Sequence, residues 1–154
     1  MPHKILVTVS VIHEGVGADY LQSYELIRGE LSKVSVAVTN LSDDFFPGGS
    51  IKNIEFRWGE QARTKMYNEF QIDSLEQNSE ANLVPSLDVI ALTEGIAWLQ
   101  LEIEATDGQP VECFQEVGGQ SVGNNNWQGA FYAVNREHLH IINLLNGFLS
   151  PKEE

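Results

Sequence analysis

Apolar and polar residues alternate with a period of two in several short segments of the chain, a pattern typical of β-strands that bury one face. The clearest segment is 31–40, where Val34, Val36 and Val38 face one way and smaller residues face the other. Residues 61–72 fit either a short polar helix or an edge strand, and the strand is preferred. The other predicted strands cover residues 5–12, 21–28, 53–58, 87–92, 98–105, 111–117 and 131–134.

The strand predicted over 98–105 has two chemically different faces. Alternation directs one set of its side chains into the core, namely Leu99, Leu101, Ile103 and Ala105. The residues between them point to the outer face and include Trp98, Glu102 and Glu104. Asp107-Gly108 then predicts a tight hairpin, with 111–117 as the partner strand. Residues 118–129, with four glycines and three consecutive asparagines, are expected to form a loop.

The C-terminal residues have a different period. Asn135 is a suitable helix N-cap, and apolar residues from 139 to 148 form a stripe that ends near Gly147. These features predict a short helix. We therefore expect a sandwich domain over residues 1–134 and a helix with a tail over 135–154, packed on the sandwich or on a partner.

Several motifs resemble immunoglobulin-like modules of the bacterial cell-adhesion-related (CARDB-like) type. They are Gly29-Glu30, the valine-alternating segment that ends at Asn40, and the late segment 99–103 closed by Asp107-Gly108. The likeness covers about residues 21–115. It implies an all-β, immunoglobulin-like antiparallel β-sandwich of about seven to nine strands, here with the short C-terminal helix added. A shared fold of this kind says little about activity.

Negative charge is concentrated in the middle of the chain. The sequence has 22 Asp and Glu against 9 Lys and Arg, for a net charge of −13, and residues 66–135 contain no Lys or Arg. Nucleic acid and anionic membranes are poor partners for such a surface, because they are bound through cations. An acidic face instead predicts steering of a basic protein partner. The cationic stretch 52–65 offers a second option, in which two copies of the chain associate.

The sequence gives little support for catalysis or for a cofactor. Cys113 is the single cysteine, and it is expected to be a structural residue because Glu112 would disfavour its thiolate. His138 and His140 lack a third ligand at metal-like spacing. Asp43 and Asp44 fit a turn better than a calcium loop. We expect no enzyme activity, no metal and no cofactor.

The candidate binding residues are aromatic, acidic and amide side chains. Trp98 and Trp127 are interpreted as exposed, beside the amides of Asn124, Asn125 and Asn126 and the carboxylates of Glu102 and Glu104. This set favours a non-catalytic protein-interaction module. Two alternatives are a carbohydrate-binding module that uses the exposed tryptophans and an acidic inhibitor or nucleic-acid mimic, including a viral one. A further interpretation has Trp98 pairing across the sheet and Trp127 packing at its edge.

The sequence leaves the compartment open. The apolar run 5–12 is too short to span a bilayer, and no small-residue cleavage site follows it. A cytoplasmic location is therefore favoured as an expectation.

Overall fold

A computed structural model describes residues 2–13, 21–59, 63–82, 86–115 and 124–137. These residues form eleven β-strands: β1 (His3–Ile12), β2 (Glu25–Ile27), β3 (Ser32–Asn40), β4 (Gly49–Trp58), β5 (Arg63–Tyr67), β6 (Phe70–Ile72), β7 (Glu80–Asn82), β8 (Leu87–Val89), β9 (Gly95–Ala105), β10 (Val111–Gln115) and β11 (Asn126–Val134). The additional strands beyond the predicted number are short ones, such as β7.

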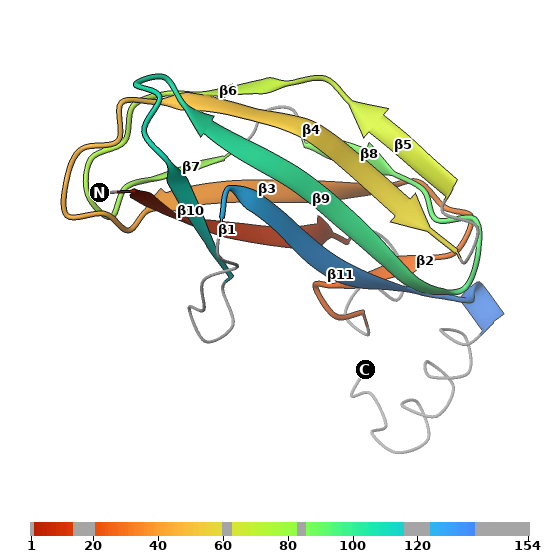
Figure 1. The fold of residues 1–154 in the computed structure, drawn as a ribbon. Coiled ribbons are helices and arrows are strands. Elements are labelled where there is room, and N and C mark those ends of the chain that lie inside the picture. Colours follow the sequence, from red (N-terminus) through yellow and green to blue (C-terminus); the bar gives the residue numbers. More distant parts are fainter. Residues whose placement is uncertain (1, 14–20, 60–62, 83–85, 116–123, 138–154) are drawn as a thin grey trace, which may run out of the picture.

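The strands form two sheets that pack face to face as a sandwich (Figure 1). The five-stranded sheet has the order β10-β1-β3-β7, with β8 also paired to β3. The six-stranded sheet has the order β2-β11-β9-β4-β5, with β6 also paired to β4. The predicted all-β, immunoglobulin-like sandwich is therefore confirmed.

Both sheets contain a parallel pair, so the fully antiparallel arrangement was wrong. β1 runs parallel to β10, with His3 opposite Val111, and β2 runs parallel to β11, with Glu25 opposite Tyr132. Parallel neighbours cannot be joined by a tight turn. In this chain the strands of each pair lie far apart in the sequence, and no local turn signal announces their pairing.

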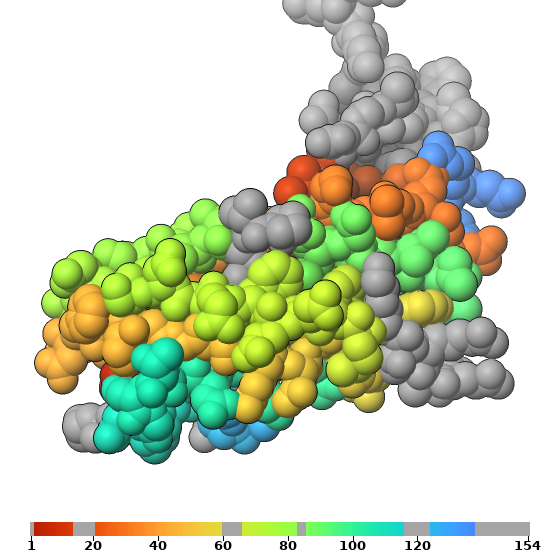
Figure 2. All heavy atoms as spheres, turned by 90° about the horizontal axis from the view of Figure 1, so that it is seen from above, coloured from red at the N-terminus to blue at the C-terminus, as the bar shows by residue number. Residues whose placement is uncertain are grey.

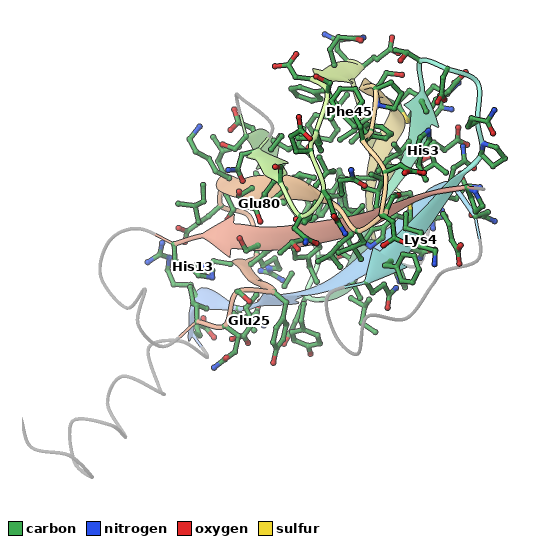
Figure 3. The ribbon with its side chains drawn as sticks, turned by 90° about the vertical axis from the view of Figure 1, so that its left-hand side faces the viewer. His3, Lys4, His13, Glu25, Phe45 and Glu80 are labelled. Carbon is green, nitrogen blue, oxygen red and sulfur yellow. The ribbon has the colours of Figure 1, made fainter. Side chains whose placement is uncertain are left out.

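The core follows the predicted alternation. Val34, Val36 and Val38 are buried, and so are Leu99, Leu101 and the other inward residues of β9. The remaining large buried side chains come from both sheets and include Ile5, Phe46, Ile51, Ile54 and Phe56. Viewed from the end at which β1 begins, the side chains between the two layers fill the interior (Figure 3). Burial of these apolar surfaces is the main stabilising term of such a domain.

The hairpin predicted at Asp107-Gly108 is not formed. Gly108 does have the positive φ of a turn, 74°, but the chain crosses there from β9 in one sheet to β10 in the other. The N–H of Gln109 donates to Oδ1 of Asp107, and His3 contacts the same carboxylate at 2.9 Å. These two interactions hold the pKa of Asp107 below its ordinary value. The turn is thus anchored to the start of β1, and this directs β10 toward β1.

Two other predictions about strands and loops need correction. Asn126–Gly129, expected within a loop, forms the first part of β11 and pairs with β9. The region predicted as strand 21–28 contributes only the short β2. The segment 63–82 closes one edge of the sandwich and passes from the six-stranded to the five-stranded sheet (yellow-green in Figure 2). Its β5 and β6 agree with the preference for an edge strand.

The predicted C-terminal helix falls mostly on residues that the structure does not describe. Arg136 and Glu137 follow Asn135 in helical geometry, and residues 138–154 lie outside the described ranges. The division between a domain over 1–134 and a helical tail over 135–154 stays a prediction. The two histidines weighed as metal ligands, His138 and His140, also lie outside the described residues.

Asn40 fixes the corner at which β3 ends. Its side chain is 0% exposed, and its Nδ2 donates to the carbonyls of Asp44 and Leu75. Its Oδ1 accepts a hydrogen bond from the N–H of Ser42, and the hydroxyl of Ser42 accepts one from the N–H of Lys4. The turn that contains Asp44 is therefore held to β1 and to the chain before β7.

Candidate functional site

The outer face of the six-stranded sheet is organised around β9. Trp98, Gln100, Glu102 and Glu104 point away from the core at alternate positions, as predicted. Trp98 is half-buried and lies opposite Arg57 of β4 and Ala130 of β11. The guanidinium of Arg57 lies 5.8 Å from the centroid of the Trp98 ring, a cation–π contact that orients the indole. The exposed Ala130 presents only a methyl group on the other side.

A β-bulge in β4 shapes the middle of this face. The register between β4 and β9 shifts between Lys52 and Glu55, and Asn53 has a positive φ of 52°. Ile51 and Ile54 are both buried. The two residues between them therefore both point outward, as a bulge requires. Nδ2 of Asn53 donates to Oε2 of Glu102 at 2.9 Å, which holds that carboxylate in place.

The bulge borders a hollow of about 400 Å³, named here the first hollow. Its lining contains six amide residues, two glutamates and two apolar residues: Asn53, Glu55, Gln100, Leu101, Glu102, Gln115, Asn124, Asn126, Trp127 and Gln128. Amides offer both donors and acceptors without net charge. The first hollow can therefore form hydrogen bonds with a neutral polar ligand in either direction.

A second hollow, also of about 400 Å³, adjoins the first and shares Asn124 with it. Its lining comes from β9, from β10 and from the chain on either side: Pro2, Ile103, Glu104, Gln109, Pro110, Val111, Glu112, Asn124 and Asn125. Its two charged side chains are both carboxylates. The two hollows together follow the second half of β9.

Asn124 and Asn125 are fixed by their backbones between the two hollows. The carbonyl of Asn124 accepts from the N–H of Cys113, and the carbonyl of Asn125 accepts from the N–H of Ile103. The side chain of Asn124 accepts from the N–H of Asn126 at 2.8 Å. The predicted amide cluster is therefore held in a defined geometry, beside Glu102 and Glu104.

Trp127 borders the first hollow, but its indole is buried and is not an exposed binding surface. Its side chain is 5% exposed and packs in the core, so the exposed interpretation was wrong and the packing interpretation holds. The strand β11 begins at Asn126, and the alternation then turns Trp127 inward and Asn126 outward. The sequence analysis missed this alternation because it assigned residues 118–129 to a loop.

The acidic residues that the structure describes between positions 66 and 115 lie on both sheets. Several have polar partners: Asp88 pairs with Lys33, Glu94 accepts from Asn135, and Glu104 pairs with Lys52. The hydrogen bond and the charge of Glu104 raise the pKa of the Lys52 ammonium. Part of the predicted cationic stretch therefore lies against the carboxylates of its own chain.

Cys113 is buried in the sandwich, as expected for a structural cysteine. Its side chain is 0% exposed, its Sγ lies 3.5 Å from the carbonyl oxygen of Asn125, and burial raises its pKa to about 12. The thiolate is the reactive form. We expect native protein at pH 7.5 to react with Ellman's reagent many-fold more slowly than the same protein in 6 M guanidinium chloride. Fast native labelling would contradict the burial of Cys113.

Among the described residues, no three His, Cys, Asp or Glu side chains are grouped so that they could hold a metal ion. The described part of the chain also contains no helix with the length and apolarity needed to span a bilayer.

Five polar residues of the first hollow were not among the predicted candidates: Asn53, Glu55, Gln100, Gln115 and Gln128. One signal for the bulge is present in the sequence, because Ile51 and Ile54 are separated by two residues instead of one. The convergence of β4, β9 and β11 on this site depends on strand order, which no local pattern encodes.

The fold and this site define an immunoglobulin-like β-sandwich with an open, polar outer face. No protein-family model matches the chain. No curated protein matches it either.

Two solved structures are similar in fold. One is the CARDB domain of a Pyrococcus furiosus protein in complex with di-metal ions: the match covers 87% of this chain and 94% of that chain, with 12% identity and a TM-score of 0.48. The other is the sporulation control protein Spo0M from Bacillus subtilis, with 11% identity and a TM-score of 0.40. The match to Spo0M covers 94% of this chain and 54% of that chain. The first of these structures is a domain of the type named in the sequence analysis.

Proposed function

We propose that the chain is a non-catalytic carbohydrate-binding module, with its ligand on the outer face of the six-stranded sheet. The observation that carries this proposal is the first hollow, whose described lining contains six amides. One of them, Gln100, lies two residues from the half-buried Trp98 on the same face of β9. Carbohydrate hydroxyls donate and accept, and amides match both roles. The ring of Trp98 supplies a flat apolar surface for the C–H face of a sugar.

The charges around the first hollow favour a neutral ligand over an anion. Its two charged residues are Glu55 and Glu102. The carboxylate of Glu102 already accepts a hydrogen bond from Asn53, and that of Glu55 lies 3.7 Å from Nε of Arg57. Asn53 is uncharged, so the carboxylate of Glu102 keeps its full charge and repels an anionic ligand, whereas Arg57 partly offsets the charge of Glu55 toward ligands of either sign.

Replacing Trp98 or Gln100 with alanine is expected to weaken binding of a neutral oligosaccharide by about tenfold or more, since ~1.4 kcal/mol of lost contact gives that factor. The probe is a printed glycan array, followed by titration calorimetry with the glycans that it retains. The matched control is Gln71→Ala, which removes an exposed glutamine from β6 of the same sheet. A Trp98→Ala protein that binds as well as the parent protein would contradict the role of this face.

A protein partner is the second candidate function, and a different end of the molecule favours it. Among the described residues, six of the eight exposed large apolar side chains lie where β1, β8 and β11 end and where β2, β3 and β9 begin: Ile12, Tyr24, Leu31, Leu92, Ile96 and Tyr132. The strand registers place Tyr132 opposite Ile96 and Glu25, and Lys33 opposite Ile12. An apolar cluster of this kind is typical of protein contacts.

A second copy of the chain is the partner that can be tested directly at this apolar end. Sedimentation velocity over a range of concentrations is expected to show association that Leu31→Lys weakens. A parent protein that stays monomeric at high concentration would contradict the hypothesis that the partner is a second copy of the chain. A basic partner would instead be recognised by an on-rate that falls with salt.

A further inference from the structure

We infer that the ligand of the outer face is an extended, uncharged oligosaccharide that lies along β9, a statement that rests on the proposed function and makes it more specific. The sugar chain begins on Trp98, passes through the first hollow and ends in the second hollow. Three observations support this: the row of side chains on β9, the continuity of the two hollows, and the sign of the charges that line them.

The outward side chains of β9 form a straight row of the length that a short sugar chain needs. Trp98, Gln100, Glu102 and Glu104 are spaced by two residues, so the row extends over about 20 Å at ~3.4 Å per residue. A single sugar ring covers only part of that length. The row therefore provides several adjacent contact points, each with a different side chain.

The two hollows adjoin each other beside this row, and together they are called the furrow. Both include Asn124, and β9 contributes Glu102 to the first hollow and Glu104 to the second. Each has a volume of about 400 Å³, which is at the lower end for a small-ligand site. A ligand that occupied one hollow alone would leave the other as open polar surface, whereas an oligomer contacts both.

The lining of the furrow selects against acidic sugars. Each hollow contributes two carboxylates, Glu55 with Glu102 and Glu104 with Glu112, and neither has Lys or Arg among its described lining residues. Arg57 and Lys52 pair with Glu55 and Glu104, so the charges of Glu102 and Glu112 are the ones without a salt bridge among the described residues. A uronate or sialate would bring a third negative charge to within a few ångströms of these groups, at a Coulomb cost that water only partly screens. A neutral hydroxyl can instead donate to a carboxylate oxygen, in a charge-assisted hydrogen bond.

The test measures affinity against chain length and ligand charge. The probes are neutral oligomers of glucose, mannose and galactose from one to six units, with oligogalacturonates as the acidic match to the galactose series. Titration calorimetry is expected to show affinity that rises by about tenfold or more, a gain of ~1.4 kcal/mol, from the dimer to the tetramer of the bound series. It is expected to show no binding of the acidic series.

Substitutions in the two hollows distinguish an extended ligand from a ligand that occupies one hollow alone. Glu112→Ala is expected to lower the affinity of the tetramer severalfold and to leave that of the dimer unchanged, because Glu112 lines only the second hollow. Gln100→Ala is expected to weaken both oligomers, because Gln100 lies in the first hollow. Gln71→Ala again serves as the control and should change neither affinity.

Each result has a distinct consequence. If a monomer binds as tightly as the longer oligomers, the extended ligand is wrong while the carbohydrate function stands. If oligogalacturonates bind better than neutral galactose oligomers, the neutral selectivity is wrong. If no glycan on the array or in solution binds, the proposed function itself fails, and the inference fails with it.

Discussion

Replacing Trp127 with alanine is expected to lower the free energy of unfolding by about 3–5 kcal/mol, the usual cost of removing a large aromatic side chain from a core. The Trp127 ring packs tightly against its own strand: a Cβ added at Gly129 would lie 2.2 Å from the ring atom Cη2. Gly129 thus leaves the space that the indole fills. Urea denaturation of the two proteins, followed by far-UV circular dichroism, measures the difference.

Trp127→Phe is the matched control for this truncation. Nε1 of Trp127 is buried and has no hydrogen-bond partner among the described residues. Phenylalanine removes that unpaired donor and keeps much of the apolar volume, so the expected loss is about 1–2 kcal/mol, close to that of other size-conserving core changes. A Trp127→Ala protein as stable as the parent, with impaired ligand binding, would restore the exposed interpretation of Trp127.

Replacing Asn40 with alanine is expected to cost about 3 kcal/mol of stability, because several buried polar groups lose their partners at once and each costs ~1–3 kcal/mol. The carbonyl of Asp44 and the N–H of Ser42 depend on this side chain, and the carbonyl of Leu75 loses one of two partners, since it also accepts from the N–H of Phe46. The variant should also loosen the start of β1, since Ser42 in turn holds Lys4. Hydrogen exchange of the Ser42 and Lys4 amides reports this local effect separately from the global loss.

Asn82 provides the control for Asn40, because it is an exposed asparagine on β7. Asn82→Ala is expected to change stability by no more than about 0.5 kcal/mol, as is usual for surface positions. Equal effects of Asn40→Ala and Asn82→Ala would show that the buried hydrogen bonds of Asn40 contribute little. An Asn40→Asp protein keeps the acceptor for Ser42, but at neutral pH it buries a carboxylate against the carbonyl oxygens of Asp44 and Leu75, so a loss at least as large as that of Asn40→Ala is expected.

The sequence was sufficient to predict the sandwich and the direction of most core side chains. The alternation in 31–40 and 98–105 is long and regular, and the burial of the side chains follows it except at Ala37, which is also buried. Neighbouring positions of a half-buried strand face opposite environments, so burial of one face produces an alternating pattern that can be recognised in the local sequence. For this reason Trp98, Glu102 and Glu104 were placed correctly on the outer face of β9.

The parts that were not predicted depend on contacts between distant segments. Asp107-Gly108 fits a hairpin locally, but His3 and the open edge of β1 direct the chain into the other sheet. Trp127 was assigned to a loop because the glycines and asparagines around it obscure a strand pattern. Its burial depends on pairing with Leu101 of β9, with which it is in register.

The candidate site was predicted only in part for the same reason. The amides of Asn124 and Asn126 and the carboxylate of Glu102 were selected from the sequence, and they do line the first hollow. The bulge brings Asn53 to Glu102 only because β4 pairs with β9. These two strands are separated by four other strands in the chain, so no local pattern predicts the contact. Charge counts likewise could not show that Lys52 neutralises Glu104.

Because β1 pairs with β10, the five-stranded sheet cannot be completed until late in the synthesis of the chain. β1 can pair with β3 early, but its other edge remains open until β10 emerges from the ribosome, most of the chain later. An open edge strand is a template for pairing with other chains, and late, non-local pairing is slow to form. Nascent chains that stop before Val111 are therefore expected to aggregate through β1, and ribosome-stalled chains of increasing length would reveal the point at which protection begins.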